Sequence, residues 1–344
     1  MSREFVDRLT PRDRALFEGL SPAEALAVFG YLFPQGTGAR LPLRMRSRAI
    51  ALYDPLCDRR RYGLGLLWQA SPYTCCDHGC AYCYGRSYLL RFGGGGRPKP
   101  GFLRAFSRDL EDMHRLGVPR RHLSMANSSD VLQARLEREH RLALALFEEL
   151  VSNRALFGSF GILTKNPGVL FDDERYVAAL LALDAEVQVS ICFFGDETAA
   201  RLERGAPPPS ERRAASERLA AAGVRVVLRL DPLFPRGVDG CPDVQTIDGD
   251  LRPLLQWAAT LPVEYVITSP MKLPIRRNRV EDFHRSLVGA FPIVRGFYRR
   301  MEPDARDRLV ADVRAIGSAL GLRVEHCLAS ILKRHPGGSV SSRH

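Results

Sequence analysis

Short apolar runs alternate with stretches of helical length from about residue 66 onward, and this alternation strongly constrains the fold. The apolar runs predict six strands, near 66–71, 121–127, 158–164, 186–193, 224–231 and 263–269. The stretches between them predict helices near 103–116, 135–152, 173–183, 210–222 and 249–260. Repeated strand–helix units require a parallel sheet, because each helix returns the chain to begin the next strand in the same direction.

Six such units with right-handed crossovers predict an α/β fold, a partial (β/α)6 barrel of the TIM type. A doubly wound open sheet is the alternative. The fourth helix is bounded by Ser210 as N-cap and Gly223 as C-cap, while a last helix near 303–320 and an apolar run at 322–328 close the domain. In a barrel of this type we expect the chemistry at the carboxyl ends of the strands.

The segment before this alternation predicts an N-terminal helical and irregular extension over 1–65. Two short helices are expected there, near 11–19 and 22–32, the second because Ser21 and Glu24 have the capping-box form. The barrel domain is then expected over 66–332. The last segment, 333–344, is polar and predicts a flexible tail.

Composition places the chain among globular proteins, since 45% of its 344 residues are hydrophobic and 26% are charged. No run reaches the roughly 18 apolar residues of a membrane span, and the N-terminus is too charged for a signal peptide. We therefore expect a soluble, cytoplasmic protein. Eight cysteines are too few for a disulfide scaffold, and clustered thiols in a reducing compartment favour ligands over bridges.

The net charge of +11 is weak evidence for a nucleic-acid partner, because 46 of the 50 basic residues are arginine. Such a bias is typical of a GC-rich coding sequence. The few lysines are more informative, since a compact ammonium and a planar guanidinium do not substitute freely at tight sites. Lys165 and Lys272 both fall near predicted strand ends.

The strongest local signal is the segment Ser71-Pro-Tyr-Thr-Cys-Cys76-Asp-His-Gly-Cys80-Ala-Tyr82-Cys83, directly after the first predicted strand. Its Cys-x3-Cys-x2-Cys spacing suits three thiolates that each hold one iron of a four-iron cluster. Full ligation needs four thiolates, so one iron stays open to bind a small molecule and pass it an electron. A structural zinc site with His78 as fourth ligand, buried inert thiols, and a register beginning at Cys75 are the alternatives.

This spacing, with the aromatic Tyr82 just before the third cysteine, resembles the radical S-adenosylmethionine superfamily. The resemblance implies a [4Fe-4S] cluster on Cys76, Cys80 and Cys83. It also implies that S-adenosyl-L-methionine binds the open iron, and that an external one-electron donor of the flavodoxin or ferredoxin type reduces the cluster. The reaction implied is reductive cleavage of S-adenosylmethionine to a 5'-deoxyadenosyl radical, which abstracts hydrogen from a substrate.

The predicted strand ends supply residues for the rest of the cofactor. Tyr82 is expected to pack beside the adenosyl group. Asn127, Ser129 and Asp130 follow the second strand and offer acceptors for an ammonium, while Lys165 follows the third strand and can pair with a carboxylate. Ser190, on the fourth strand, carries a hydroxyl suited to a carboxylate or a ribose.

A closer resemblance covers about residues 66–280 and is to the spore photoproduct lyase group. It rests on the Pro-Tyr-Thr start, the tyrosines around Cys83, the Ser-Ser-Asp130 turn, the Thr-Lys165 pair and the stretch Arg201-Leu-Glu203-Arg-Gly205. True lyases carry a hydrogen-donor cysteine where this chain has Asn127, so repair of the spore lesion is not expected. The catalytic candidates become Tyr84 as a hydrogen relay and Cys192 as a donor.

Four cations follow the sixth predicted strand, and Lys272, Arg276 and Arg277 among them suit a phosphate-bearing substrate. We therefore expect a nucleotide or nucleic-acid substrate. The alternatives are a radical S-adenosylmethionine enzyme acting on a biosynthetic small molecule or peptide, and a non-catalytic nucleic-acid-binding module stabilised by a metal.

Overall fold

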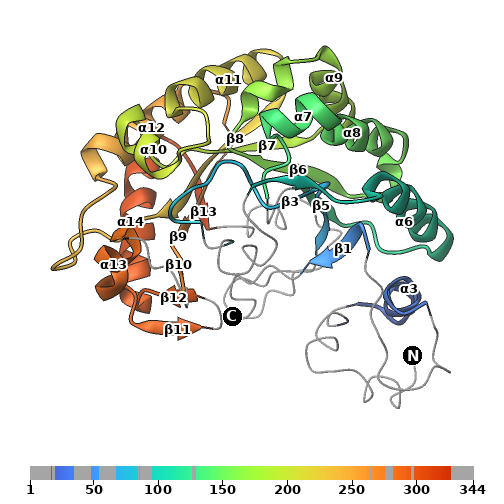
Figure 1. The fold of residues 1–344 in the computed structure, drawn as a ribbon, viewed down its shortest axis with the longest axis horizontal. Coiled ribbons are helices and arrows are strands. Elements are labelled where there is room, and N and C mark those ends of the chain that lie inside the picture. The colour runs from blue at the N-terminus through green and yellow to red at the C-terminus, as the bar shows by residue number, and fades with distance from the viewer. Residues whose placement is uncertain are drawn as a thin grey trace.

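The protein is organised around an eight-stranded sheet (Figure 1) in a computed structural model that describes residues 17, 20–34, 48–53, 67–83, 85, 95–125, 129–263, 265–275, 282–295 and 298–326. The strands follow the spatial order β1-β2-β5-β6-β7-β8-β9-β13. Their bounds are β1 Ile50–Tyr53, β2 Leu67–Ala70, β5 His122–Met125, β6 Ser159–Thr164, β7 Glu186–Ser190, β8 Arg225–Leu233, β9 Val266–Pro270 and β13 Val324–His326.

All neighbouring pairs from β2 to β13 are parallel, and only β1 runs antiparallel, against β2. The six predicted strands are therefore confirmed, and they stand side by side in chain order. A doubly wound sheet would reverse its strand order at one point, and this sheet does not. The expected partial barrel is confirmed.

Helices cover the convex side of the sheet, as the arc from α6 through α8, α9 and α11 to α14 shows in Figure 1. The helices are α3 Pro22–Leu32, α6 Phe102–Leu116, α7 Ala134–His140, α8 Leu142–Ser152, α9 Glu174–Leu183, α10 Asp196–Leu202, α11 Pro209–Ala221, α12 Arg252–Ala259, α13 Asp282–Leu287 and α14 Pro303–Ala319. Short 3-10 turns span Arg154–Leu156, Pro167–Phe171 and Val288–Ala290, and a π turn, Ile247–Leu251, precedes α12. Crossovers between parallel strands are right-handed as a rule, which places successive helices of such a sheet on one side and leaves the other side open for a site.

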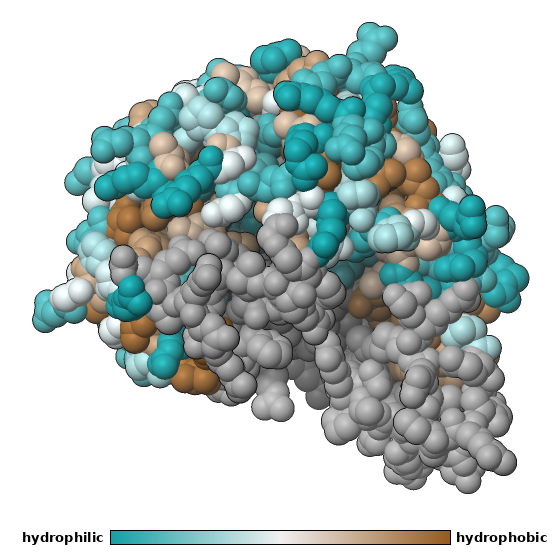
Figure 2. Space-filling view, viewed as in Figure 1, coloured by the Kyte–Doolittle hydropathy of each residue, from teal (hydrophilic) through white to brown (hydrophobic). Residues whose placement is uncertain are grey.

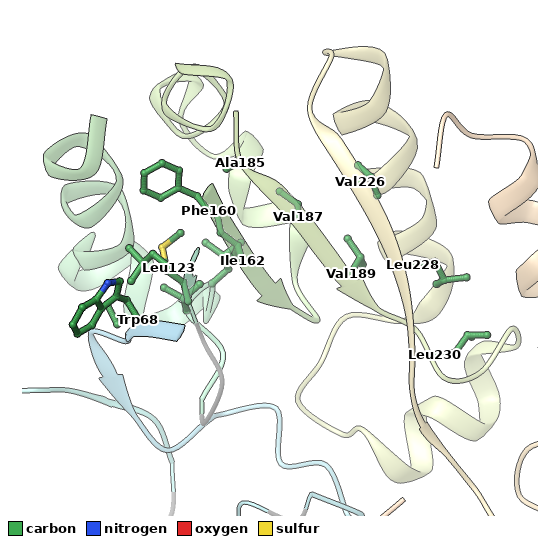
Figure 3. Close-up of a cluster of buried hydrophobic side chains, with 14 of the residues drawn as sticks. Trp68, Leu123, Phe160, Ile162, Ala185, Val187, Val189, Val226, Leu228 and Leu230 are labelled. Carbon is green, nitrogen blue, oxygen red and sulfur yellow. The ribbon is translucent and has the colours of Figure 1, made fainter. Parts of the chain in front are cut away.

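The core lies between the convex side of the sheet and these helices (Figure 3), and alternate strand residues fill it. The side chains at these alternate positions are apolar and fully or almost fully buried: Leu123, Phe160, Ile162, Val187, Val189, Val226, Leu228 and Leu230. Such alternation follows from the two-residue period of a strand, which sends neighbouring side chains to opposite faces. Hydrophilic side chains cover much of the outer surface above the helices (Figure 2).

The concave side of the same strands combines buried polar residues with a small apolar cluster that includes Val227 and Ile267. It carries residues such as Ser124, Gln188, Ser190 and Arg229, all buried, and the Gln188 Oε1 atom accepts a 2.7 Å hydrogen bond from Arg229 Nη1. Each lies one residue away from an apolar residue of the convex face. The strands thus separate a hydrophobic core from a polar hollow.

The N-terminal helix α3 begins as the sequence predicted. Glu24 N donates to Ser21 Oγ at 3.3 Å, and Ser21 N donates to Glu24 Oε2 at 2.9 Å, which completes the capping box. The strand β1 lies within the segment expected to be an extension, yet it pairs with β2 at the edge of the sheet. The helix expected at 11–19 and the tail at 333–344 lie outside the described residues, apart from Phe17.

Two helix predictions need correction. The single helix expected over 135–152 is two helices, because Arg141 adopts a left-handed φ of 50° and separates α7 from α8. The N-cap of α11 is Pro208, not Ser210, whose hydroxyl instead donates to Asp196 at 2.6 Å. Gly223 ends that helix as expected, with a left-handed φ of 84° immediately after Ala222.

Smaller sheets lie outside the main one. The antiparallel strands β10 Leu273–Pro274, β12 Tyr298–Arg300 and β11 Ile293–Arg295 form one, and β3 Tyr73–Thr74 pairs with β4 Arg97–Pro98 to form the other. Within the part of the chain that the structure describes, none of the helices combines the length and the apolarity needed to span a membrane.

Candidate active site

The loop that carries the cysteines leaves the carboxyl end of β2 and is held by backbone contacts to a distant part of the chain. Ala81 N donates to Leu202 O at 2.7 Å, and Gly205 N donates to His78 O at 2.9 Å. A side chain at Gly205 would not fit, since its Cβ would come within 2.1 Å of the Asp77 carbonyl oxygen. The loop is therefore locked against the segment after α10.

A buried histidine and aspartate fix the same loop from a second direction. His78 Nε2 lies 2.9 Å from Asp130 Oδ2, and His78 Nδ1 lies 3.1 Å from Gly205 O. Both ring nitrogens thus face an oxygen of the chain, so the zinc alternative with His78 as fourth ligand would have to give up one of these contacts.

Both carboxylate oxygens of Asp130 accept hydrogen bonds from other residues of the chain. Its Oδ1 accepts from Leu132 N and Thr164 Oγ1, both at 2.9 Å, and its Oδ2 accepts from Lys165 N at 2.6 Å besides facing His78. Burial opposes ionisation, but the His78 ring and these hydrogen bonds prevail and lower the pKa of Asp130. This carboxylate, expected to bind the cofactor, ties the cysteine loop to the end of β6.

Of the other two site residues expected after the second strand, the structure describes Ser129 but not Asn127. Ser129 Oγ donates to Tyr73 O at 2.9 Å and lies 2.9 Å from Ser71 Oγ, so it too contacts the start of the cysteine loop. Asn127 and Tyr84 lie outside the described residues.

The three predicted cysteine ligands lie in this loop, with Cys80 buried and Cys76 and Cys83 half-buried. Burial raises the pKa of Cys80, and the nearby thiols of Cys83 and Cys76 add to the effect, while Lys165 opposes it. Cys80 therefore lies within electrostatic reach of the other two thiols and of the Lys165 ammonium at the end of β6.

These donors fit an iron–sulfur cluster by their chemistry. Among the described residues, no three His, Cys, Asp or Glu side chains converge on a point that could hold a single ion. A four-iron cluster makes a different demand, because each thiolate binds its own iron and the sulfur atoms need not converge. Three thiols at Cys-x3-Cys-x2-Cys spacing fit that demand, on a loop that also carries the buried Cys75.

Lys165 and Ser190 are brought together as the sequence predicted. Lys165 Nζ donates to Ser190 Oγ at 2.8 Å and pairs with Glu203 Oε1 at 2.9 Å. Its Nζ atom also lies 4.0 Å from Cys192 Sγ and 5.5 Å from the centre of the Tyr82 ring. The ends of β6 and β7 thus place one half-buried ammonium among the expected cofactor residues.

Glu203 lies at the centre of this group of side chains. The sequence pointed to it only as part of the stretch Arg201-Leu-Glu203-Arg-Gly205, which resembles the spore photoproduct lyase group. The Glu203 carboxylate is fully buried, pairs with Lys165 and with Arg212 Nη2 at 2.5 Å, and accepts from the hydroxyl of Tyr82. Burial alone would raise the pKa of Glu203, but the charges of Lys165 and Arg212 lower it to about 2. Glu203 is therefore ionised at neutral pH.

Cys192 lies beside the same group of side chains. Its Sγ atom is 3.8 Å from the Tyr82 hydroxyl, and the residue is almost fully buried. Burial is the main cause that raises the pKa of Cys192 to about 11; Glu203 and Asp231 add to it and Lys165 opposes it. The thiol thus keeps its proton at neutral pH.

Of the three expected substrate-binding residues, the structure describes only Lys272. Lys272 lies between β9 and β10, with its Nζ atom 5.7 Å from the centre of the Tyr298 ring. Arg276 and Arg277 lie outside the described residues.

Solved structures of spore photoproduct lyase have a similar fold. One mutant of that enzyme aligns over 75% of this chain and 76% of its own, with a TM-score of 0.56 and 14% identity. A second mutant, with bound AdoMet and dinucleoside spore photoproduct, aligns over 75% of each chain with the same score and identity. A complex with dinucleoside spore photoproduct aligns over 75% and 76%, with a TM-score of 0.55 and 14% identity.

These likenesses define the class of fold as the partial barrel seen in those structures. Within that class, the particular resemblance to spore photoproduct lyase that the sequence indicated is confirmed at the level of the fold. No protein-family model and no curated protein sequence matches the chain.

Proposed function

We propose that this protein is a radical S-adenosylmethionine enzyme that acts on a nucleotide or nucleic-acid substrate. The observation that carries the proposal is one juxtaposition. The loop of Cys76, Cys80 and Cys83 lies at the carboxyl ends of the strands, where Lys165 Nζ lies 5.5 Å from the centre of the Tyr82 ring that precedes Cys83. Active sites of α/β barrels lie at this end.

Cys76, Cys80 and Cys83 would hold a [4Fe-4S] cluster with one iron open. When bound, the cluster and S-adenosylmethionine together supply reductive cleavage of the sulfonium to a 5'-deoxyadenosyl radical. The protein's own part is to keep the cysteine loop in place, which His78, Asp130 and Gly205 do by the contacts described above.

Lys165 and Ser190 suit the carboxylate of the cofactor's methionine part. The buried cations Lys165 and Arg212 exceed the one carboxylate of Glu203 by a single positive charge. A ligand carboxylate would complete that balance, and Ser190 Oγ helps to hold the ammonium by accepting from it at 2.8 Å. Glu203 holds Lys165 in place from the opposite side.

Cys192 suits the role of hydrogen donor. A thiol with a pKa of about 11 keeps its S–H bond at neutral pH, and the neighbouring Tyr82 hydroxyl, 3.8 Å away, can connect it to the loop. We assign Tyr84 as a second relay on the sequence resemblance alone. Asn127 does not take the role of the lyase cysteine, because an amide N–H bond is too strong to give up its hydrogen atom.

The substrate class follows from two supports. The fold is that of an enzyme solved with a dinucleoside bound. The chain carries a net charge of +11, and Lys272, with Arg276 and Arg277, follows the last barrel strand and suits phosphate.

The proposed chemistry also requires an external one-electron donor of the flavodoxin or ferredoxin type. Outside the cysteine loop, Cys192 and Cys241 are the described cysteines, and they lie 49 residues apart in sequence and on different segments. We place the protein in the cytoplasm, because a reducing compartment keeps the loop thiols available for iron.

The test is anaerobic reconstitution with iron and sulfide, followed by dithionite and S-adenosylmethionine, with 5'-deoxyadenosine as the measured product. We expect its formation, and a faster rate when short DNA is added. An intact, reducible cluster that yields no 5'-deoxyadenosine would refute the proposed chemistry. Formation that rises with a small molecule or peptide and not with DNA would refute the substrate class alone.

A further inference from the structure

One buried side-chain amide bonds the backbone on both sides of Cys76. Gln133 stands directly before α7 and is 1% exposed. Its Oε1 atom accepts from Asp77 N at 2.8 Å, and its Nε2 atom donates to Cys75 O at 3.3 Å. The first bond holds the peptide group after Cys76 and the second holds the peptide group before it. Gln133 therefore fixes both peptide planes that define the backbone torsions of Cys76.

The turn that leads into Cys76 needs such support. Cys75 has a left-handed φ of 62°, which a residue with a Cβ atom adopts only at a cost. A conformation of this kind persists where the surrounding structure holds it. Gln133 bonds the Cys75 carbonyl and is itself anchored, because its Nε2 atom also donates to Asp130 O at 2.8 Å. The turn is thus held by a contact from outside the cysteine loop.

A glycine closes the remaining side of the Gln133 amide. A run of four glycines in the sequence ends at Gly96, which is buried. A Cβ atom at Gly96 would lie 2.0 Å from Gln133 Oε1 and 2.9 Å from Gln133 Cδ. The backbone N of Gly96 also donates to Asp77 Oδ1 at 2.5 Å. Only a glycine permits this close approach, so the amide is enclosed and has one orientation.

We propose that Gln133 is a positioning residue for the first cysteine of the loop. By holding both peptide groups of Cys76, it leaves the thiol only the side-chain torsion with which to adjust to an iron atom. Such outer contacts orient ligands and tune the group that they hold. This inference rests on the proposed function, because it takes Cys76 as a cluster ligand. Gln133 acts through the backbone of the loop and needs no contact with the bound group.

The experiment compares the reconstituted wild-type protein with Gln133→Met, which keeps the length of the side chain and removes its three hydrogen bonds. Gln245→Met is the matched control. Gln245 is also buried, and its amide bonds Phe234 N and Cys192 O, away from the cysteine loop. Three quantities are measured: the melting temperature of the metal-free protein, the rate of iron release to a chelator, and the midpoint potential of the cluster.

We expect both variants to melt below the wild type, since each loses buried hydrogen bonds. Gln133→Met alone should release iron about tenfold faster or more and shift the midpoint potential. If Gln133→Met releases iron at the wild-type rate and with the wild-type potential, its role is structural and the inference is overturned. A wild-type protein that takes up no cluster would overturn the proposed function, and this inference with it.

A second substitution tests the backbone mechanism by rescue. Glycine adopts a left-handed φ without cost, so Cys75→Gly added to Gln133→Met should recover much of the lost iron retention. Faster release that Cys75→Gly leaves uncorrected would overturn the inference. Cys75→Gly alone should retain iron like the wild type. If it takes up no iron, Cys75 is a ligand in place of Cys76, and the proposed ligand set fails first.

Gly96→Ala perturbs the same contact while Gln133 stays in the sequence. The added Cβ atom must displace the Gln133 amide, so iron release should again accelerate. Gly195→Ala is its control, because a Cβ atom there would meet no atom within 4 Å and φ is –82°. Should Gln133→Met fail to fold, this pair decides. Equal release from Gly96→Ala and Gly195→Ala would refute the positioning role of Gln133.

Discussion

The two faces of the same six strands carry opposite chemistry. On the convex face, residues such as Phe160 and Leu228 are apolar and buried under helices (Figure 3). On the concave face, one residue along each strand, Gln188, Ser190 and Arg229 are equally buried but hydrogen-bonded. Burial alone therefore does not distinguish core from site in this fold; the polarity of alternate residues does.

This difference implies a division of tasks. The apolar face contributes stability through the burial of hydrocarbon, and the polar face costs stability unless its groups are paired. The proposed site lies where the polar face reaches the carboxyl ends of the strands. Substitutions on the two faces should therefore affect different measurements.

The largest effect is expected for Cys80→Ala at the polar end. Cleavage of S-adenosylmethionine should fall at least about a thousandfold, equivalent to about 4 kcal/mol, because one iron loses its thiolate. Stability of the metal-free protein should change by less than about 1 kcal/mol, since the substitution removes one small atom. Cys241→Ala, outside the loop, is the matched control, and full cleavage by Cys80→Ala would refute the ligand assignment.

Next in size is Phe160→Ala on the apolar face. The cavity left between β6 and the helices should lower the free energy of unfolding by about 3–5 kcal/mol in urea denaturation. The folded fraction should still bind S-adenosylmethionine with wild-type affinity. Leu181→Ala, at a leucine that is 46% exposed, should change stability by no more than about 0.5 kcal/mol. A loss of ligand affinity in Phe160→Ala would contradict the claim that the apolar face affects stability and not ligand binding.

The pH dependence of stability tests the ionised state of Glu203. The pKa of Glu203 is about 2 in the folded protein against 4.5 as its ordinary value, so the unfolded chain takes up this proton first as the pH falls. Its contribution of about 3 kcal/mol should be fully present above pH 4.5 and be lost toward pH 2. The slope of urea midpoints against pH should shrink in Glu203→Gln and persist in the exposed control Glu139→Gln.

The smallest effect is expected for Ser190→Ala. The variant loses the hydroxyl that accepts from Lys165 Nζ and helps to fix it, so affinity for S-adenosylmethionine should fall several-fold, equivalent to about 1 kcal/mol. Ser210→Ala serves as control, because that hydroxyl contacts only Asp196 at the start of α11. An unchanged affinity in Ser190→Ala would show that the ligand carboxylate does not bind beside Ser190 on β7.

Local patterns were enough to predict the six parallel strands, most helices and the juxtaposition of Lys165 with Ser190. Strand ends of a parallel sheet meet at one edge, so residues that end neighbouring strands must come together. The sequence pattern missed β1 and the antiparallel sheet of β10, β11 and β12, because such short strands are defined by partners far along the chain. The break at Arg141 was missed as well, since an arginine gives no signal for a left-handed turn.

The missed site residues share a physical reason. Glu203 and Arg212 lie at the end of α10 and in α11, away from any strand end, and only the fold turns them toward Lys165. Gln133 gives no local signal either. Its amide meets the backbone on both sides of Cys76 across 56 and 58 residues of sequence, and only the fold brings them together.

The close approach of Gly205 to the cysteine loop has a consequence for biosynthesis. The cysteine loop is synthesised early, but two of the groups that hold it, Leu202 and Gly205, are made more than a hundred residues later. A nascent chain that ends before this segment has all three thiols and the contacts to Asp130, but not these two backbone contacts. If the proposed function holds, iron and sulfide would meet the fully held loop only after the segment has left the ribosome.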